Sequence, residues 1–320
     1  MEVEKHGARL GSRLDGDSCL SRRRPWSRSF EGPWATAASA HEINLGQRRS
    51  PGEPSPTVSG SSTCSARTVC DDSHMQRGAN RENVDLLDAR EVQFVETAGP
   101  AVTRAQQSFM DGAWDEAVRA NPNLFDGPVV LCTELHQDSA GRLVVSWARA
   151  TYRYRVLRQL SDAPALSSVF VCVLQPTQDG RVLVGHMSRS TSSPGQLQFP
   201  GGNMEPPPTG ELLTVAALRR HAAVELGEEV GIRVADEELD LWLAARVPSG
   251  NVGFFFSAPA LPGELAIRPH AALVDAERAR GCDPEFDGVT LIQSAAELAA
   301  VDGAPADYLR PLVRRFLRAD

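Results

Sequence analysis

Residues 199–232, FPGGNMEPPPTGELLTVAALRRHAAVELGEEVGI, join a glycine turn, a proline-rich loop and an alanine-rich segment that ends in clustered glutamates. Apolar residues recur at helical spacing over residues 212–230, and Gly231 follows where a left-handed helix cap is favoured. We therefore predict a largely buried helix over residues 212–230. Because strands are expected before and after this helix, the chain is predicted to be an α+β protein with an αβα sandwich.

The end of this helix carries three glutamates, Glu225, Glu228 and Glu229, at i, i+3 and i+4. Like charges at this spacing cost about 0.2–0.5 kcal/mol per pair, and anions are also disfavoured at a helix C-terminus. A bound divalent cation such as Mg²⁺, which prefers oxygen ligands, would make the clustering of these carboxylates favourable instead of unfavourable. Gly201 and Gly202 let the backbone approach a ligand closely. The pattern predicts metal-assisted cleavage of a phosphate ester or anhydride, and a solvated helix end is the alternative.

The same residues resemble the Nudix box, the signature of hydrolases that act on nucleoside diphosphates linked to another moiety. The family pattern is G-x5-E-x7-R-E-U-x-E-E-x-G-U, with U aliphatic. Residues 225–232, ELGEEVGI, match its second half, and FPGG at residues 199–202 resembles the usual lead-in. The resemblance implies a Nudix-type αβα sandwich with an N-terminal α/β extension.

The first half of the box departs from the family pattern. Val224 stands at the arginine position, and a strict count places Ala216 and Gly210 at the early glutamate and the opening glycine. If Gly202 is instead the opening glycine, the loop NMEPPPTG contains extra residues. In the family the arginine helps to orient a glutamate, so its absence bears on rate and substrate class more than on metal binding.

A similar box, with a proline-containing insertion and no arginine, occurs in the UDP-glucose diphosphatase branch of the family. The stretches AWDEAVRANPNLFDGP (113–128) and ATYRYR (150–155) also resemble that branch. The resemblance implies that Phe125 and Tyr152 lie against the uridine, and the alternative is that both are core aromatics.

The resemblance also implies the roles of the site residues. Glu225 and Glu229 would ligate Mg²⁺, with Mn²⁺ as an alternative ion, and the carbonyl of Gly201 would complete the coordination. Glu228 would be a further ligand or the base that activates water, and Glu285 is a second candidate by its position after the box. The predicted substrate-binding residues are Phe125, Tyr152, Gly202, Glu205 and Arg189, with His186 as the weaker alternative to Arg189.

The resulting hypothesis is Mg²⁺-dependent hydrolysis of UDP-glucose or UDP-galactose to UMP and a sugar 1-phosphate. A Nudix enzyme for ADP-ribose or a dinucleotide is one alternative. A catalytically silent nucleotide-binding module is the other, and the missing box arginine is its main support. The expected partner is a small-molecule nucleotide sugar, with neither nucleic acid nor membrane.

Composition divides the 320-residue chain into three expected parts. Residues 1–80 are rich in Ser, Arg, Gly and Pro and are predicted to be a disordered tail, with an internal translation start at Met75 as an alternative. Residues 81–165 are expected to form the extension, with a strand at 91–97, a helix within 103–122 and a strand pair over 128–157. Residues 166–320 are expected to form the Nudix domain, with strands at 167–187, 239–248, 252–260 and 287–295 and a helix over 306–319.

Net charge, apolar run lengths and cysteine spacing argue against nucleic-acid-coating, membrane-spanning and zinc-finger proteins. A net charge of -8 argues against a protein that mainly coats nucleic acid. The longest apolar runs are shorter than the roughly 20 residues that span a bilayer, and the first residues lack a signal-peptide pattern, so a cytoplasmic location is expected. The six cysteines form no CxxC pair, which favours neither a zinc finger nor a disulfide framework.

Overall fold

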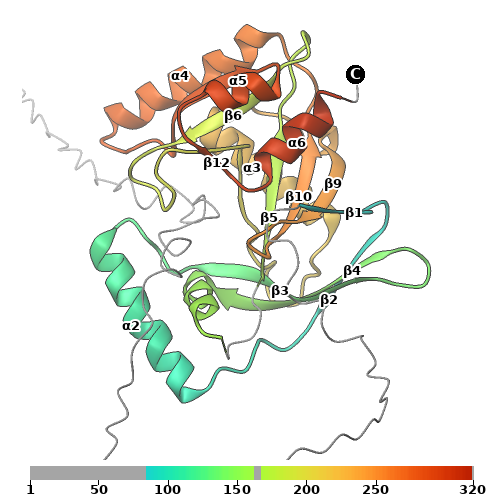
Figure 1. Cartoon of the computed structure of the whole chain (residues 1–320), viewed down its shortest axis with the longest axis vertical. Helices are drawn as coiled ribbons and strands as arrows, with labels where there is room; N and C mark the ends of the chain where they lie inside the picture. The colour runs from blue at the N-terminus through green and yellow to red at the C-terminus, as the bar shows by residue number, and fades with distance from the viewer. Residues whose placement is uncertain (1–83, 162–166, 319–320) are drawn as a thin grey trace, which may run out of the picture.

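The computed structural model describes residues 84–161 and 167–318, and the structural statements below refer to these residues. The predicted tail (1–80) and the start at Met75 lie outside them. A large mixed sheet runs through the molecule, with helices on both of its sides (Figure 1). The predicted α+β class is confirmed. Within the described ranges, no helix combines the length and apolar character needed to cross a membrane.

The large sheet joins the N-terminal residues to the rest of the chain. Its order is β1 (Asp85–Leu87), β9 (Asp240–Arg246), β10 (Val252–Ser257), β5 (Ser167–Leu174), β3 (Pro128–Gln137), β4 (Leu143–Thr151) and β2 (Val92–Glu96), and β8 (Gly201–Asn203) pairs with β5. The predicted strand pair is confirmed, because β3 and β4 are antiparallel neighbours. Strand β5 is the hub, since it pairs with β10 in parallel and with β3 and β8 in antiparallel fashion.

A smaller sheet has the order β11 (Phe286–Ile292), β6 (Val182–Met187), β7 (Gln196–Gln198) and β12 (Ala304–Pro305). The sequence predicted an apolar strand, a PTQDG turn and a return strand over residues 167–187. Both strands are present, but β5 belongs to the large sheet and β6 to the small one. The chain therefore changes sheets at this turn, where Thr177 N–H donates to the carbonyl of Arg181.

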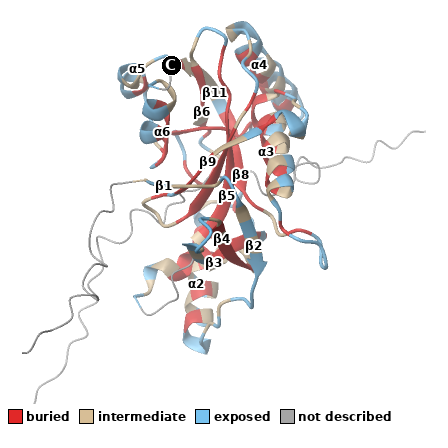
Figure 2. Cartoon of the chain, turned by 90° about the vertical axis from the view of Figure 1, so that its right-hand side faces the viewer, coloured by how far each residue is buried: buried red, intermediate tan, exposed pale blue. Residues whose placement is uncertain are grey.

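The alternation of side chains along β5 gives the fold two cores. Val169, Val171 and Val173 face a cluster that includes residues of α3 (Val215–Val230) and of α4 (Gly263–Ala279). Phe170, Cys172 and Leu174 face a second cluster that includes residues of α5 (Ala295–Ala300) and α6 (Leu309–Phe316). In Figure 2 the two helix pairs lie on opposite sides of the buried strands, as in an αβα sandwich.

A third cluster lies between β3, the predicted helix α2 (Arg104–Ala120) and a 3-10 segment, η4 (Tyr152–Gln159). Thr103 and Gln106 form a reciprocal capping box at the start of α2. The sequence predicted strand to residue 157, but β4 ends at Thr151. The chain then turns, because Val156 and Leu157 are buried against α2 rather than alternating across a sheet.

Helix α3 begins later than predicted, at Val215 instead of residue 212. The hydroxyl of Thr214 accepts a hydrogen bond from Ala217 N–H and caps the helix. Leu212 lies before the cap and is 83% exposed, so its apolar character does not mark a buried turn. Gly231 ends the helix in the left-handed conformation, as predicted.

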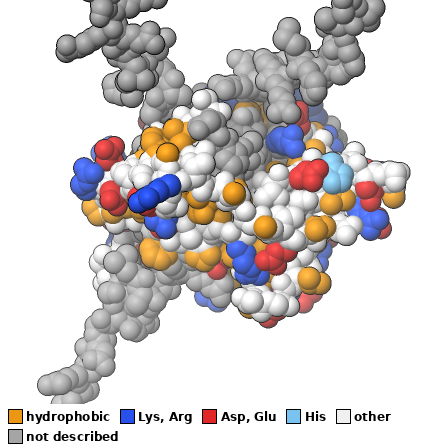
Figure 3. Space-filling view, turned by 90° about the horizontal axis from the view of Figure 1, so that it is seen from below, with side chains coloured by type: hydrophobic (Ala, Val, Ile, Leu, Met, Phe, Trp, Pro, Cys, Tyr) orange, Lys and Arg blue, Asp and Glu red, His pale blue; other side chains and the backbone are white. Residues whose placement is uncertain are grey.

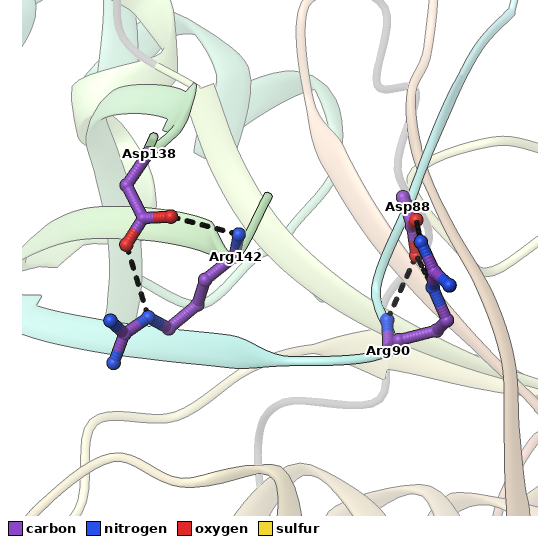
Figure 4. A network of polar contacts seen from close by, with 4 residues as sticks. All are labelled: Asp88, Arg90, Asp138 and Arg142. Atoms are coloured by element: carbon purple, nitrogen blue, oxygen red, sulfur yellow. Dashed lines mark hydrogen bonds and ion pairs between the residues drawn. The ribbon is translucent and has the colours of Figure 1, made fainter. Parts of the chain in front are cut away.

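Acidic side chains fix two surface turns near β2 (Figure 4). Asp138 accepts hydrogen bonds from the backbone N–H of Ala140 and Arg142 and from Nε of Arg142, which holds the β3–β4 turn. Asp88 pairs with Arg90 just before β2. Charges of both signs lie interspersed on the face seen in Figure 3.

The remaining short element is η5 (Asp236–Glu238), between α3 and β9.

Candidate active site

The glycine strand β8 lies against β5 so closely that one residue has no room for a side chain. Gly201 has φ +154°, and a Cβ there would lie 2.1 Å from the carbonyl oxygen of Val171. Only glycine satisfies both constraints. The backbone of Gly201 and Gly202 thereby lies within contact distance of glutamate side chains from the C-terminal turns of α3.

Two glutamates of α3 reach this backbone and are almost completely buried. Glu225 and Glu229 are each 2% exposed. Gly201 N–H donates to Oε2 of Glu229 at 2.6 Å. A Cβ on Gly202 would lie 2.4 Å from Oε1 of Glu225, so the missing side chain is the space that this carboxylate occupies. The structure therefore brings together Gly201, Gly202, Glu225 and Glu229.

The environment of Glu229 disfavours negative charge. Burial raises its pKa well above the ordinary value, and the charges of Glu285, Glu225 and Glu228 raise it further, against the hydrogen bond from Gly201. Glu228 itself is exposed, so only two of the three box glutamates are buried. A buried group of this kind is stabilised as a carboxylate when a cation lies beside it.

The residues present fit a divalent cation. Among the described residues, Oε2 of Glu225 and Oε1 of Glu229 are buried and have no hydrogen-bond partner. Also among those residues, no three His, Cys, Asp or Glu side chains form a ready metal-binding group. Mg²⁺ usually takes one or two carboxylates and completes its shell with water and substrate phosphates, so two such oxygens suffice. The carbonyl of Gly201 as a further ligand stays a prediction.

A histidine that sequence reasoning missed also contacts Glu225. Nε2 of His221 lies 3.1 Å from Oε1 of Glu225 and 3.0 Å from the carbonyl oxygen of Asn203. Burial opposes protonation of the ring, but the hydrogen bond and charge of Glu225 and the charge of Glu205 outweigh it, so the pKa of His221 is raised. Its position four residues before Glu225, on the same helix face, was the available signal.

The loop of Arg189 adjoins the same cluster. The carbonyl of Glu285 accepts a hydrogen bond from Ser188 N–H at 2.8 Å, and the charge of Glu285 acts on Glu229. Glu285 is buried, whereas Arg189 is exposed at the molecular surface. His186, the alternative to Arg189, contacts the hydroxyl of Thr290 instead.

The two predicted uridine-side aromatics have different surroundings. Phe125 is 48% exposed, on a loop fixed by hydrogen bonds from Asn121 and Asn123 to the carbonyls of Thr191 and Ser190. This loop therefore lies beside the loop of Arg189. Tyr152 is 5% exposed, packs edge-on against Trp114 and accepts a hydrogen bond from Arg155. Tyr152 thus lies in the α2 cluster, and contact of either aromatic with a nucleotide stays a prediction.

Comparison with known proteins gives remote structural similarities. No family model matches the chain, and no curated protein matches it. The MutT protein from Methanosarcina mazei Go1 is 18% identical with a TM-score of 0.33, covering 48% of this chain and 94% of that chain. DR0079 from Deinococcus radiodurans is 18% identical with a TM-score of 0.33, covering 59% and 98%. A NUDIX hydrolase from Nitrosomonas europaea is 20% identical with a TM-score of 0.32, covering 48% and 70%.

Proposed function

We propose that the chain is a Mg²⁺-dependent Nudix hydrolase that cleaves a nucleoside diphosphate sugar, UDP-glucose or UDP-galactose, to UMP and a sugar 1-phosphate. The observation that carries the proposal is the buried pair Glu225 and Glu229, each with an oxygen that makes no hydrogen bond to any described residue. Two buried carboxylates at the C-terminal end of a helix destabilise the fold when no cation is present. Beside a glycine backbone, the same two carboxylates are suitable ligands for a divalent cation. In this proposal residues 81–165 supply the nucleoside-side surface and residues 166–320 the hydrolytic domain.

The metal ion would offset the charge of the diphosphate and lower the pKa of a bound water. Glu225 and Glu229 would hold it, and Gly201 N–H would keep the carboxylate of Glu229 in place. Water attacks one phosphorus, the bridging P–O bond breaks, and the proton of the water passes to a carboxylate. Glu228, which is exposed, and Glu285, which adjoins Glu229, are the two candidates for that proton acceptor.

The remaining residues would bind the substrate. Arg189 lies on the surface loop beside Glu285 and would pair with the diphosphate through its guanidinium. Phe125 projects from the adjoining loop and would lie against the uracil ring. The absence of a Cβ on Gly202 keeps the space next to Glu225 open, and Glu205 would accept a hydrogen bond from the sugar or the base.

The test measures release of UMP from UDP-glucose with and without Mg²⁺ by wild type, Glu225→Gln, Glu229→Gln and the control Glu116→Gln. Glu116 is exposed on α2, away from the cluster. We expect the two site variants to lose at least about 100-fold in kcat/KM, equivalent to about 2.7 kcal/mol, and the control to match wild type. ADP-ribose and a dinucleotide complete the panel. Turnover of ADP-ribose or a dinucleotide without turnover of a UDP-sugar would show that the proposed substrate is wrong. Equally low release of UMP by all four proteins would show that the proposed enzymatic activity is wrong.

A further inference from the structure

His221 lies at the junction of the two halves of the candidate site. It belongs to α3, one turn before Glu225, and is 8% exposed. Its Nε2 atom is 3.0 Å from the carbonyl oxygen of Asn203, the last residue of β8, and 3.1 Å from Oε1 of Glu225. One ring nitrogen thus contacts both the glycine strand and the helix glutamate.

The chemistry of these two neighbours determines where the ring hydrogen is. A backbone carbonyl oxygen can only accept, and an ionised carboxylate also only accepts. Nε2 of His221 must therefore carry a hydrogen and share it between the two oxygens. This holds for the neutral ring as well as for the charged one, so the donation does not depend on protonation of Nδ1.

The shared donor constrains the carboxylate of Glu225. Oε1 is fixed between the ring and the space left by the missing Cβ of Gly202. Oε2 then has no hydrogen-bond partner among the described residues. The residue before Glu225, Val224, has no side-chain donor that could do the same. His221 therefore occupies one oxygen of Glu225 and leaves the other for a ligand.

A second buried histidine shows what a purely structural role looks like in this fold. His270 on α4 is 5% exposed, and its Nε2 lies 3.1 Å from the carbonyl oxygen of Phe286. No carboxylate of the described residues forms an ion pair with its ring within 4.0 Å. The contact with a buried glutamate is what sets His221 apart.

We propose that His221 is a positioning residue, whose Nε2–H orients the carboxylate of Glu225 toward a divalent cation and ties it to the backbone of β8. The inference rests on the proposed function in one respect, that Glu225 is a cation ligand. It predicts that removing the donor weakens cation binding through Glu225 and not through the stability of the fold.

The experiment titrates the full chain with Mn²⁺, used as the probe, and measures free ion by electron paramagnetic resonance. The variants are His221→Asn, His221→Gln, Glu225→Gln, the double variant H221N/E225Q and the control His270→Gln. The amide nitrogen of Gln can reach the place of Nε2, whereas that of Asn ends one bond short. Loss of a hydrogen bond to a metal ligand typically costs about 10–100-fold in affinity. We therefore expect His221→Asn to weaken Mn²⁺ binding by at least about 10-fold.

The expected pattern distinguishes positioning from packing. His221→Gln should restore affinity to within about 3-fold of wild type, well inside the loss caused by removing the bond. In the Glu225→Gln background His221→Asn should change little further, and His270→Gln should keep full affinity even if its melting temperature falls. Equal losses in both backgrounds, or wild-type affinity in His221→Asn, would overturn the proposal for His221 while leaving the proposed function standing. Wild type that binds no Mn²⁺ would overturn both. Wild type that binds Mn²⁺ but releases no UMP would overturn only the function.

Discussion

Helices α2 and α3 are of similar length, 17 and 16 residues, and both begin at a threonine cap, yet they end in opposite ways. The last turn of α2 carries Arg119, which complements the negative end of the helix dipole. The last turns of α3 have no basic residue and bury Glu225 and Glu229. Local rules explain both ends of α2 but only the first half of α3. A sequence that breaks such rules in one place usually does so where it binds or reacts.

The largest effect expected from this comparison is on the stability that α2 supplies. Trp114 is buried against Tyr152 in the α2 cluster. Trp114→Ala should destabilise the protein by about 3–5 kcal/mol, because it removes a large apolar contact and leaves a cavity. Urea unfolding monitored by circular dichroism measures this. Mn²⁺ affinity of the folded variant should equal that of wild type. A large loss of affinity would mean that α2 and the site are not separable.

Two glycines provide the next contrast. Gly202→Ala would place a Cβ 2.4 Å from Oε1 of Glu225, so we expect metal affinity and kcat/KM to fall by about 10–100-fold. Gly112 on α2 has nothing within 4 Å of an added Cβ. Gly112→Ala should instead raise stability by about 0.8–1.0 kcal/mol, the helix propensity difference, and leave activity unchanged. Calorimetry and Mn²⁺ titration of both variants check this pair, and equal metal affinities would contradict it.

The buried charge of α3 should also appear as a pH dependence of stability. The pKa of Glu229 is raised in the folded state, so the folded protein binds a proton there more tightly than the unfolded chain does. The free energy of unfolding gained from this proton is fully present below the unfolded-state pKa, near 4.5, and is lost as pH rises through the folded-state pKa. The metal-free protein should therefore lose stability from about pH 4.5 upward. Glu229→Gln should flatten this dependence and raise the melting temperature at pH 7.5 by about 2–4 °C, equivalent to about 1 kcal/mol.

Differential scanning calorimetry in EDTA measures this effect, and exposed Glu116→Gln on α2 is the matched control. Added Mg²⁺ should raise the melting temperature of wild type more than that of Glu229→Gln, since the cation binds the carboxylate. A lower melting temperature for metal-free Glu229→Gln at pH 7.5 would show that the carboxylate is stabilising without a cation.

The smallest expected effects are at the two threonine caps, where the helices are alike. Thr103→Ala and Thr214→Ala should each cost about 1 kcal/mol, because each removes one side-chain acceptor from a helix N-terminus. Thr214 lies eleven residues before Glu225, about 16 Å along the helix. We therefore expect Thr214→Ala to leave Mn²⁺ affinity unchanged, as Thr103→Ala should. A change confined to Thr214→Ala would show that the two ends of α3 are coupled.

The sequence predicted the regular elements where periodicity and capping agree. The α+β class, helix α2 and the β3–β4 pair follow directly from apolar spacing and turn residues. Helix α4 was missed because Pro269 stands inside it, and an interior proline ordinarily costs about 3 kcal/mol. Burial of Ala266, His270 and Val274 on one face of α4 accompanies that cost, and such packing is invisible before the fold is known.

The candidate site could be predicted only in part. Glu225, Glu229 and the glycine pair could be proposed from local spacing, and the structure brings them together. The contact of His221 with Asn203 depends on how β8 docks beside α3, which no local pattern encodes. The proximity of Glu285 and Glu229 likewise joins the loop before β11, in the small sheet, to a helix packed on the large sheet. Sequence position alone made Glu285 a candidate but gave no reason for its burial.

The chain passes from β5 in the large sheet to β6 in the small sheet, and β11, which pairs with β6, comes much later in the sequence. The acidic cluster is therefore completed late in synthesis, because Glu285 directly precedes β11. Strand β8 and helix α3, which both contact β5, are synthesised soon after it. The parallel neighbour β10 and the loop with Glu285 emerge only later. Nascent chains that halt before Glu285 would therefore hold Glu225, Glu228 and Glu229 without the acidic neighbour that the loop before β11 supplies. The electrostatic repulsion that a cation relieves would become complete only at a late stage of translation.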